Sequence, residues 1–252
     1  MFKRSFGLFF GVTSYLVFFA SFLYAIGFIG NFIVPRSIDG VPQVSLFTAL
    51  LVNGGLLTLF ALQHSVMARP AFKRWWTRYV PKLLERSVYT LFSSLALFGL
   101  FAFWQPMGGF VWQVESQVAR CVIHTSYALG WVVVLVSTFQ INHFDLFGLR
   151  QSWSYFRGTE YKPLKFTTPG FYRYVRHPLY VGWFIVFWSS PEMSAAHLFF
   201  AVMTTAYILI AVRLEERDLE DELPQYRSYK SQVPRFIPRV SYRRKPALAV
   251  GT

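Results

Sequence analysis

Long apolar runs separated by short polar segments make up most of this chain. Four of these runs cover residues 6–33, 44–67, 87–105 and 121–141. Each run is close to the about 20 residues that a helix needs to cross roughly 30 Å of hydrocarbon. The first run exceeds the apolar core of a signal peptide, which has about 7–15 residues, so we expect it to be retained. The pattern predicts an all-α integral membrane protein.

A last apolar region, residues 179–212, is interrupted at residues 189–192, where the sequence is Ser-Ser-Pro-Glu. Because Pro191 lacks an amide hydrogen and restricts the residue before it, we expect the helix to break there. The two arms, 179–190 and 194–213, then form a helical hairpin, of which only the second arm is long enough to cross a membrane. We therefore expect four transmembrane helices plus a C-terminal hairpin, which makes five to six membrane segments.

The basic residues are distributed unevenly between the two sides of this topology. Of the 25 Lys and Arg residues, two precede the first run, six lie in residues 69–86, six in residues 142–178 and nine from Arg213 onward. The two others occupy the intervening loops. Such an excess marks the cytoplasmic side, so we expect both termini in the cytoplasm. The net charge of +13 then belongs to a face near anionic lipid, and the alternation argues against a nucleic-acid binder.

Composition narrows the class of protein further. Hydrophobic residues make up 54% of the 252 residues and charged residues only 15%, against about 25% in soluble domains. Cys121 is the single cysteine, so the fold does not depend on an internal disulfide. No glycine-rich strand–turn–helix loop occurs, which excludes a soluble nucleotide-binding fold. We expect one membrane domain over residues 1–252, with a basic, disordered end at 242–252.

Basic residues stand at the start of the hairpin. Arg173, Arg176 and His177 precede Pro178, a residue favoured in the first turn of a helix. The free N–H groups of such a turn favour an anionic group, and two arginines would reinforce this preference. The alternative interpretation is that these are ordinary basic residues at the cytoplasmic edge of a membrane.

Acidic residues stand at the other end of the hairpin. Glu215 and Glu216 directly follow the last apolar turn, where carboxylates are costly unless they are paired or hydrated. Because the hairpin brings them beside His177, we expect one to bind a cation, such as an amino group, and the other to pair with an arginine. The later acidic residues of the run, Glu220–Glu222, are interpreted as solvated.

Two histidines lie at the predicted cytoplasmic ends of scaffold helices. His64 ends the second run, and His143 ends the fourth together with Asn142 and Asp145. These four residues are candidates for binding or deprotonating a small acceptor. The spacing of His143 and Asp145 is weak for a metal, and no third ligand stands out, so we expect no metal site. His197, near the outer end of the hairpin, is interpreted as structural.

The hairpin and tail, residues 168–239, carry motifs of a known family. RHPLYVGW, then LEERDL, then YRSYKSQVPRFIPR resemble the pattern of integral-membrane methyltransferases related to isoprenylcysteine carboxyl methyltransferase and phospholipid methyltransferase. The resemblance implies that this region binds S-adenosylmethionine at the cytoplasmic face. The candidate cofactor residues are Arg173, Arg176, His177, Pro178, Tyr180, Gly182, Glu215, Glu216, Tyr226 and Tyr229.

The resemblance extends over nearly the whole chain. QHSVMARPAFKRWWTR, ERSVYTLFSSLALF and INHFDLFGLRQ are similar to the bacterial methanethiol S-methyltransferases, within the wider NnrU-like membrane family. This similarity implies an enzyme of the bacterial inner membrane that methylates methanethiol to dimethyl sulfide and leaves S-adenosylhomocysteine. Other acceptors, such as a prenylcysteine carboxylate or a phospholipid amine, stay open, as does a non-enzymatic NnrU-like protein. The sequence does not determine the oligomeric state.

The chemical groups of S-adenosylmethionine suggest roles for the candidate residues. Arg176 or His177, at the start of a helix, suits its carboxylate, and Glu215 or Glu216 suits its ammonium. An aromatic face near the sulfonium is attractive by about 0.5–2 kcal/mol. Such faces are offered by Tyr180, Tyr226 and Tyr229.

Overall fold

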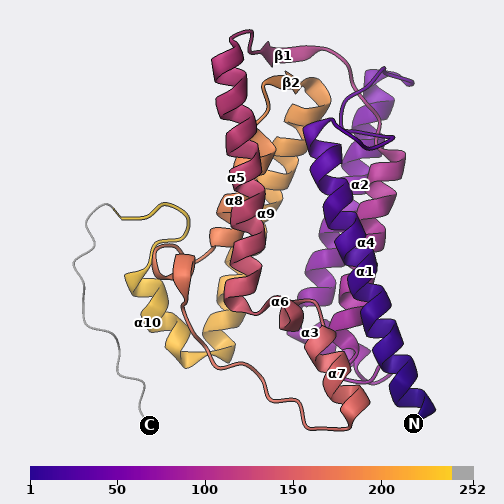
Figure 1. Cartoon of the computed structure of the whole chain (residues 1–252), viewed down its shortest axis with the longest axis vertical. Helices are drawn as coiled ribbons and strands as arrows, with labels where there is room; N and C mark the ends of the chain where they lie inside the picture. The colour runs from indigo at the N-terminus through magenta and orange to yellow at the C-terminus, as the bar shows by residue number, and fades with distance from the viewer. Residues whose placement is uncertain (240–252) are drawn as a thin grey trace.

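Six apolar helices run alternately up and down along one axis in the computed structural model, which describes residues 1–239 (Figure 1). Five of them are long and apolar enough to cross a membrane. These are α1 (Phe2–Gly30), α2 (Leu46–Ala68), α4 (Glu85–Phe103), α5 (Gln117–Ile141) and α9 (Ala195–Glu222). The sixth, α8 (Pro178–Trp188), has 11 residues and spans only about 16 Å. The all-α membrane fold with four helices and a hairpin is therefore confirmed, and only the second arm of the hairpin is long enough to cross.

Short helices gather at the end of the bundle where α1 begins, which we call the basic end (Figure 1). They are α3 (Pro70–Trp76), α6 (His143–Leu146), α7 (Leu149–Arg157) and α10 (Pro224–Gln232), with the 3₁₀ helix η1 (Gly170–Arg173) before α8. The long helix α9 also ends there. Since 28 residues of helix extend about 42 Å, the last turns of α9 pass beyond a hydrocarbon layer of roughly 30 Å.

The hairpin turns at the opposite end of the bundle. There α8 ends at Trp188 and α9 begins at Ala195, so the predicted break at Pro191 is confirmed. A two-stranded antiparallel sheet, β1 (Phe110–Gln113) with β2 (Glu192–Ser194), holds this turn. The sequence did not predict these strands, because each is shorter than a recognisable alternating pattern. The predicted disordered end at 242–252 lies outside the described residues.

The first arm of the hairpin packs against α5 with almost no space between the two backbones. A Cβ atom added at Gly182 would lie 2.8 Å from the backbone nitrogen of Val134 and 2.9 Å from the carbonyl oxygen of Gly130. A Cβ atom at Gly130 would in turn lie 3.1 Å from the backbone nitrogen of Val186. This pair of glycines therefore lets α8 lie directly on α5, which sets the position of the hairpin relative to the scaffold.

A buried histidine ties the basic end of α5 to α1. His143, in α6, lies 2.9 Å by Nε2 from the hydroxyl of Tyr15 and 2.8 Å by Nδ1 from the hydroxyl of Thr138. Its ring stacks on Phe139 with 4.4 Å between the centroids. Burial lowers the pKa of His143, so the folded protein favours the neutral imidazole.

We predict that Gly182→Ala destabilises the protein, because its new Cβ meets backbone atoms that cannot move independently. Overpacking of this kind costs about 1–3 kcal/mol, which lowers Tm by several degrees in detergent. The matched control is Gly55→Ala in α2, where nothing lies within 4 Å of the added Cβ. It should leave Tm unchanged or raise it slightly, because alanine is favoured in helices. Equal melting temperatures for the two variants would contradict the packing role of Gly182.

The lowered pKa of His143 also predicts a pH dependence of stability. The unfolded chain takes up the proton more readily than the folded protein, so this stabilisation is complete above the unfolded pKa of about 6.5. It is lost as the pH falls from there through the lower folded pKa. His143→Gln, which cannot titrate, should therefore show a shallower fall in Tm between about pH 7 and 5. His124→Gln, at an exposed position on α5, should keep the wild-type slope; a wild-type slope in His143→Gln as well would refute the assignment.

Candidate functional site

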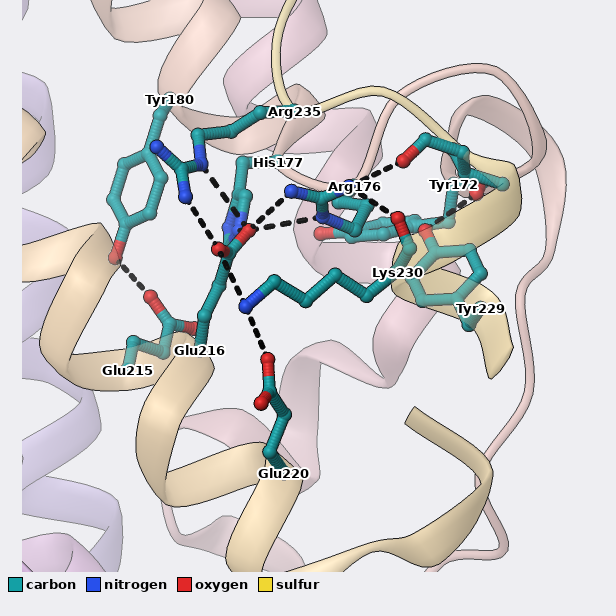
Figure 2. A network of polar contacts seen from close by, with 11 residues as sticks. Tyr172, Arg176, His177, Tyr180, Glu215, Glu216, Glu220, Tyr229, Lys230 and Arg235 are labelled. Atoms are coloured by element: carbon teal, nitrogen blue, oxygen red, sulfur yellow. Dashed lines mark hydrogen bonds and ion pairs between the residues drawn. The ribbon is translucent and has the colours of Figure 1, made fainter. Parts of the chain in front are cut away.

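Glu216 of α9 lies buried at the centre of an ionic cluster, with 1% of its surface exposed (Figure 2). Its Oε1 accepts hydrogen bonds from Nε of Arg176 at 2.9 Å and from the imidazole of His177, whose Nε2 lies 3.0 Å away. Its Oε2 lies 2.6 Å from Nη2 of Arg235 and 3.8 Å from Nζ of Lys230. The hairpin thus brings a carboxylate beside His177, as the sequence predicted.

Backbone hydrogen bonds explain why the basic residues converge there. Pro178 occupies the first turn of α8, so Arg176 and His177 lie just before the helix and their amides face outward. These amides donate to the carbonyls of Pro234, at 2.9 Å, and Arg235, at 3.2 Å. The guanidinium of Arg176 also donates to the carbonyls of Lys230, at 2.9 Å, and Val233. The tail after α10 is therefore fastened to the start of the hairpin.

The two neighbouring glutamates are in different environments. Glu215 is partly exposed, and its Oε2 accepts a hydrogen bond of 2.8 Å from the hydroxyl of Tyr180. Within residues 1–239 no basic side chain pairs with it, whereas Glu216 has three cationic neighbours and His177 around it. The sequence left open which glutamate pairs with an arginine. The structure shows that this is Glu216, whereas the carboxylate of Glu215 contacts a tyrosine.

Two acidic residues beyond this pair form ion pairs, which corrects the interpretation of Glu220 as simply solvated. Asp218 forms an ion pair with Arg69 at 2.7 Å, and Glu220 forms one with Lys230. The physical reason is that α9 continues past the apolar region, so these carboxylates reach α2 and α10 while they are still helical. They link the hairpin to its neighbours.

The two predicted tyrosines of the tail lie on α10 and pack on Phe166, with ring centroids 6.2 Å away for Tyr226 and 5.6 Å for Tyr229. The hydroxyl of Tyr229 donates to the carbonyl of Tyr172 at 2.6 Å. The hydroxyl of Tyr226 is buried and has no hydrogen-bond partner in the described part of the chain. Burial raises the pKa of both tyrosines, so both stay protonated and can donate.

The other candidate cofactor residues occupy different positions. Arg173 is exposed in η1 and makes no ion pair with any residue from 1 to 239. Pro178 is buried at the first turn of α8, where it supports the neighbouring His177. Gly182 faces α5, as described above, and its contacts are those of helix packing.

His64 lies in a second polar cluster, between α2 and α4. Its Nε2 is 2.9 Å from the hydroxyl of Tyr89, and its Nδ1 is 3.2 Å from the hydroxyl of Ser93. The next residue, Ser65, shares a hydrogen bond of 3.0 Å with Tyr207 of α9. Because Tyr207 belongs to α9, this hydrogen bond joins the cluster of His64 to the second arm of the hairpin.

The remaining catalytic candidates lie in a separate place, at the base of α5. The side chain of Asn142 caps α6 by accepting a hydrogen bond of 3.1 Å from the amide of Asp145. The carboxylate of Asp145 binds Arg150 at 3.0 Å and the hydroxyl of Tyr161 at 2.9 Å. The structure therefore does not pair His143 with Asp145, and no contact among the described residues joins either of them to His64.

Sequence reasoning missed several members of these clusters. Lys230 and Arg235 lie within the tail motif that the sequence analysis used, so a count of charges around Glu216 could have found them. Tyr89 and Tyr207 lie inside apolar runs. The sequence does not show whether the hydroxyl of such a tyrosine faces a neighbouring helix or the outside of the bundle. No group of three or more His, Cys, Asp and Glu residues that could hold a metal occurs within the described chain.

Comparison with known proteins identifies the family. A family model described as a protein of unknown function (DUF1295) matches residues 39–233. The methanethiol S-methyltransferase of Crocosphaera subtropica is 57% identical over 94% of this chain and 93% of its own length. Methanethiol S-methyltransferase 2 of Bradyrhizobium diazoefficiens is 49% identical, over 97% of this chain and 95% of its own length. The methanethiol S-methyltransferase of Mycobacterium tuberculosis is 47% identical, over 94% of this chain and 97% of its own length.

No solved structure matches the chain. The sequence relationships, in contrast, extend across the scaffold helices as well as the hairpin. The chain therefore belongs to the DUF1295 family of membrane proteins, together with these methanethiol S-methyltransferases.

Proposed function

We propose that this protein transfers a methyl group from S-adenosylmethionine to methanethiol, which yields dimethyl sulfide and S-adenosylhomocysteine. The observation that carries the proposal is the near full-length relationship to proteins of that activity. A methyltransferase needs a methyl donor. The choice of S-adenosylmethionine is supported by the chemistry of the cluster around Glu215 and Glu216.

The amino acid end of S-adenosylmethionine carries an ammonium and a carboxylate on one carbon, so its site needs charges of both signs close together. Glu215 supplies an open carboxylate for the ammonium. The cluster beside it contains three basic side chains that are always charged at neutral pH, against two carboxylates, Glu216 and Glu220. The excess positive charge suits the ligand carboxylate.

The aromatic residues of the tail suit the other end of the same ligand. The hydroxyl of Tyr226 is buried without a partner in the described chain, which is the state of a group that can bond to a ligand. Tyr229, which is only partly buried, presents an aromatic ring on the same helix as Lys230. An adenine can stack on such faces, and a sulfonium gains about 0.5–2 kcal/mol from one.

When bound, S-adenosylmethionine supplies an electrophilic methyl group attached to a positively charged sulfur. The acceptor thiol reacts as its thiolate, so a group of the protein is needed to take its proton. We assign this role to His64, whose imidazole is oriented by Tyr89 and Ser93. The scaffold helices then hold the thiolate in line with the bond that breaks, and such positioning supplies much of the rate.

The orientation in the membrane follows from the same proposal. We infer that the basic end faces the cytoplasm of a bacterial inner membrane, because loops on that side contain 23 of the 25 Lys and Arg residues. A charged nucleotide then reaches the hairpin from the cytoplasm. One domain, in which α1, α2, α4 and α5 support the hairpin and tail, is sufficient for this arrangement.

The proposed activity predicts a defined product. Purified protein supplied with methyl-labelled S-adenosylmethionine and methanethiol should release labelled dimethyl sulfide, measured by gas chromatography. A prenylcysteine and a phospholipid extract, tested as acceptors under the same conditions, should stay unlabelled. Labelled lipid would assign the protein to the alternative acceptors. Absence of any labelled product while S-adenosylhomocysteine still binds would remove methanethiol as the substrate.

The two glutamates should respond differently to the same substitution. Glu215→Gln should weaken S-adenosylhomocysteine binding about tenfold or more in a calorimetric titration, because a charge-assisted hydrogen bond contributes about 1.5–3 kcal/mol. Its Tm should stay close to the wild-type value. Glu216→Gln should instead lower Tm, because it leaves buried cations without their counter-charge.

The control for both variants is Glu222→Gln, an exposed position at the end of α9. It should change neither the affinity for S-adenosylhomocysteine nor Tm. Wild-type affinity in Glu215→Gln would show that the ammonium does not bind there.

A further inference from the structure

The groups assigned to the two substrates lie on different helices. Glu215, assigned to the methyl donor, belongs to α9, and His64, assigned to the acceptor thiol, belongs to α2. The carboxylate of Glu215 is oriented from α8 by Tyr180 at 2.8 Å, and His64 is oriented from α4 by Tyr89 at 2.9 Å. The alignment of donor and acceptor therefore depends on how α9 is held against α2.

Among residues 1–239, two polar contacts between side chains join the end of α2 to α9. The hydroxyl groups of Ser65 and Tyr207 share a hydrogen bond of 3.0 Å. Beyond it, Nη1 of Arg69, the residue that caps the end of α2, lies 2.7 Å from Oδ2 of Asp218. Nε of the same guanidinium donates to the carbonyl of Ser65 at 3.2 Å. The guanidinium of Arg69 is thus held by its own helix while it binds α9.

These two contacts constrain the rotation of α9 about its own axis. Asp218 follows Tyr207 by 11 positions, which at about 100° per residue returns it to the same face within roughly 20°. Glu216 points about 180° from Tyr207, toward the hairpin start and the tail. Glu215 lies between these faces, about 80° from Tyr207, and Figure 2 shows its side chain leaving α9 in a different direction from that of Glu216. α9 is therefore held from two opposite sides, with Glu215 between them.

The ion pair of Arg69 and Asp218 is suited to position rather than to stability. Their side chains are 29% and 30% exposed, and ion pairs that water can reach stabilise a folded protein little. The buried cluster around Glu216 already fastens α9 to the start of α8 and to the tail. Loss of the Arg69 pair should therefore leave the fold and the proposed donor site intact, while α9 is free to turn relative to α2.

We propose that Arg69 and Asp218 are positioning residues, which hold the donor bound at Glu215 in line with the acceptor at His64. This inference rests on the proposed function. With its side chains a helix has a radius of about 5–6 Å, so a rotation of α9 by about 20° moves the side chain of Glu215 by about 2 Å. A misplacement of about 1 Å can lower a rate roughly 100-fold. Arg69 and Asp218 act through α9 and touch neither substrate.

The test reverses the two charges separately and together. Arg69→Asp and Asp218→Arg should each lower kcat for methanethiol methylation about tenfold or more, because like charges then push α9 away from α2. The affinity for S-adenosylhomocysteine in a calorimetric titration and Tm should stay close to the wild-type values. The double variant, which carries both substitutions, restores a pair of opposite charges and should recover most of kcat.

Matched controls reverse exposed charges nearby. Arg74→Asp in α3 and Asp221→Arg in α9 make the same changes of charge at positions that form no ion pair within residues 1–239. Each should keep the wild-type kcat. Arg69→Gln removes the attraction without adding repulsion, so it should lower kcat less than Arg69→Asp does, and it serves as the test if the reversed variant does not fold.

Three results would overturn the positioning role while thiol methylation itself stands. The first is wild-type kcat in Arg69→Asp, or in Arg69→Gln where that variant replaces it. The second is a double variant no more active than the single variants. The third is a loss of affinity for S-adenosylhomocysteine equal to the loss of kcat, since Arg69 or Asp218 would then bind the donor directly. If the wild-type protein methylates no thiol, the proposed function and this inference both fail.

Discussion

A carboxylate that is almost completely removed from solvent holds the functional half of this protein together. Burying the charge of Glu216 at the edge of a membrane is costly unless cations and hydrogen bonds compensate it. The compensation comes from Arg176 and His177 before α8 and from Arg235 in the tail, with Lys230 of α10 nearby. One side chain thus fixes the start of the hairpin, its second arm and the tail against one another. The start of the hairpin and the tail could not move away from α9 without leaving this buried carboxylate uncompensated.

This arrangement separates a structural carboxylate from a functional one. Neighbouring residues of a helix point about 100° apart, so Glu215 and Glu216 cannot both face the start of α8. Glu216 is directed toward His177, and Glu215 toward Tyr180, which lies one turn further along α8. Tyr180 orients Glu215 without neutralising it. Glu215 is therefore the member of the pair that forms no ion pair with any residue from 1 to 239.

The sequence predicts those parts of the structure that follow from the membrane itself. Apolar length and the alternation of Lys and Arg locate α1, α2, α4, α5 and the return of the chain at Pro191, because each depends only on the position of a residue along the membrane normal. The sequence contains no comparable signal for the rotation of each helix about its own axis. For this reason the sequence could not separate His64, which faces the hairpin, from His143, which is buried against Tyr15, nor predict that Gly182 packs on α5. The family motifs located the ionic cluster but did not distinguish its members.

The direction of α9 places apolar and ionic surroundings along one helix. α9 passes from the sheet end, past Tyr207, to Glu215 and then to the ions around Glu216. Along this one helix the surroundings change from hydrocarbon to salt bridges within about 14 Å, the length of nine residues.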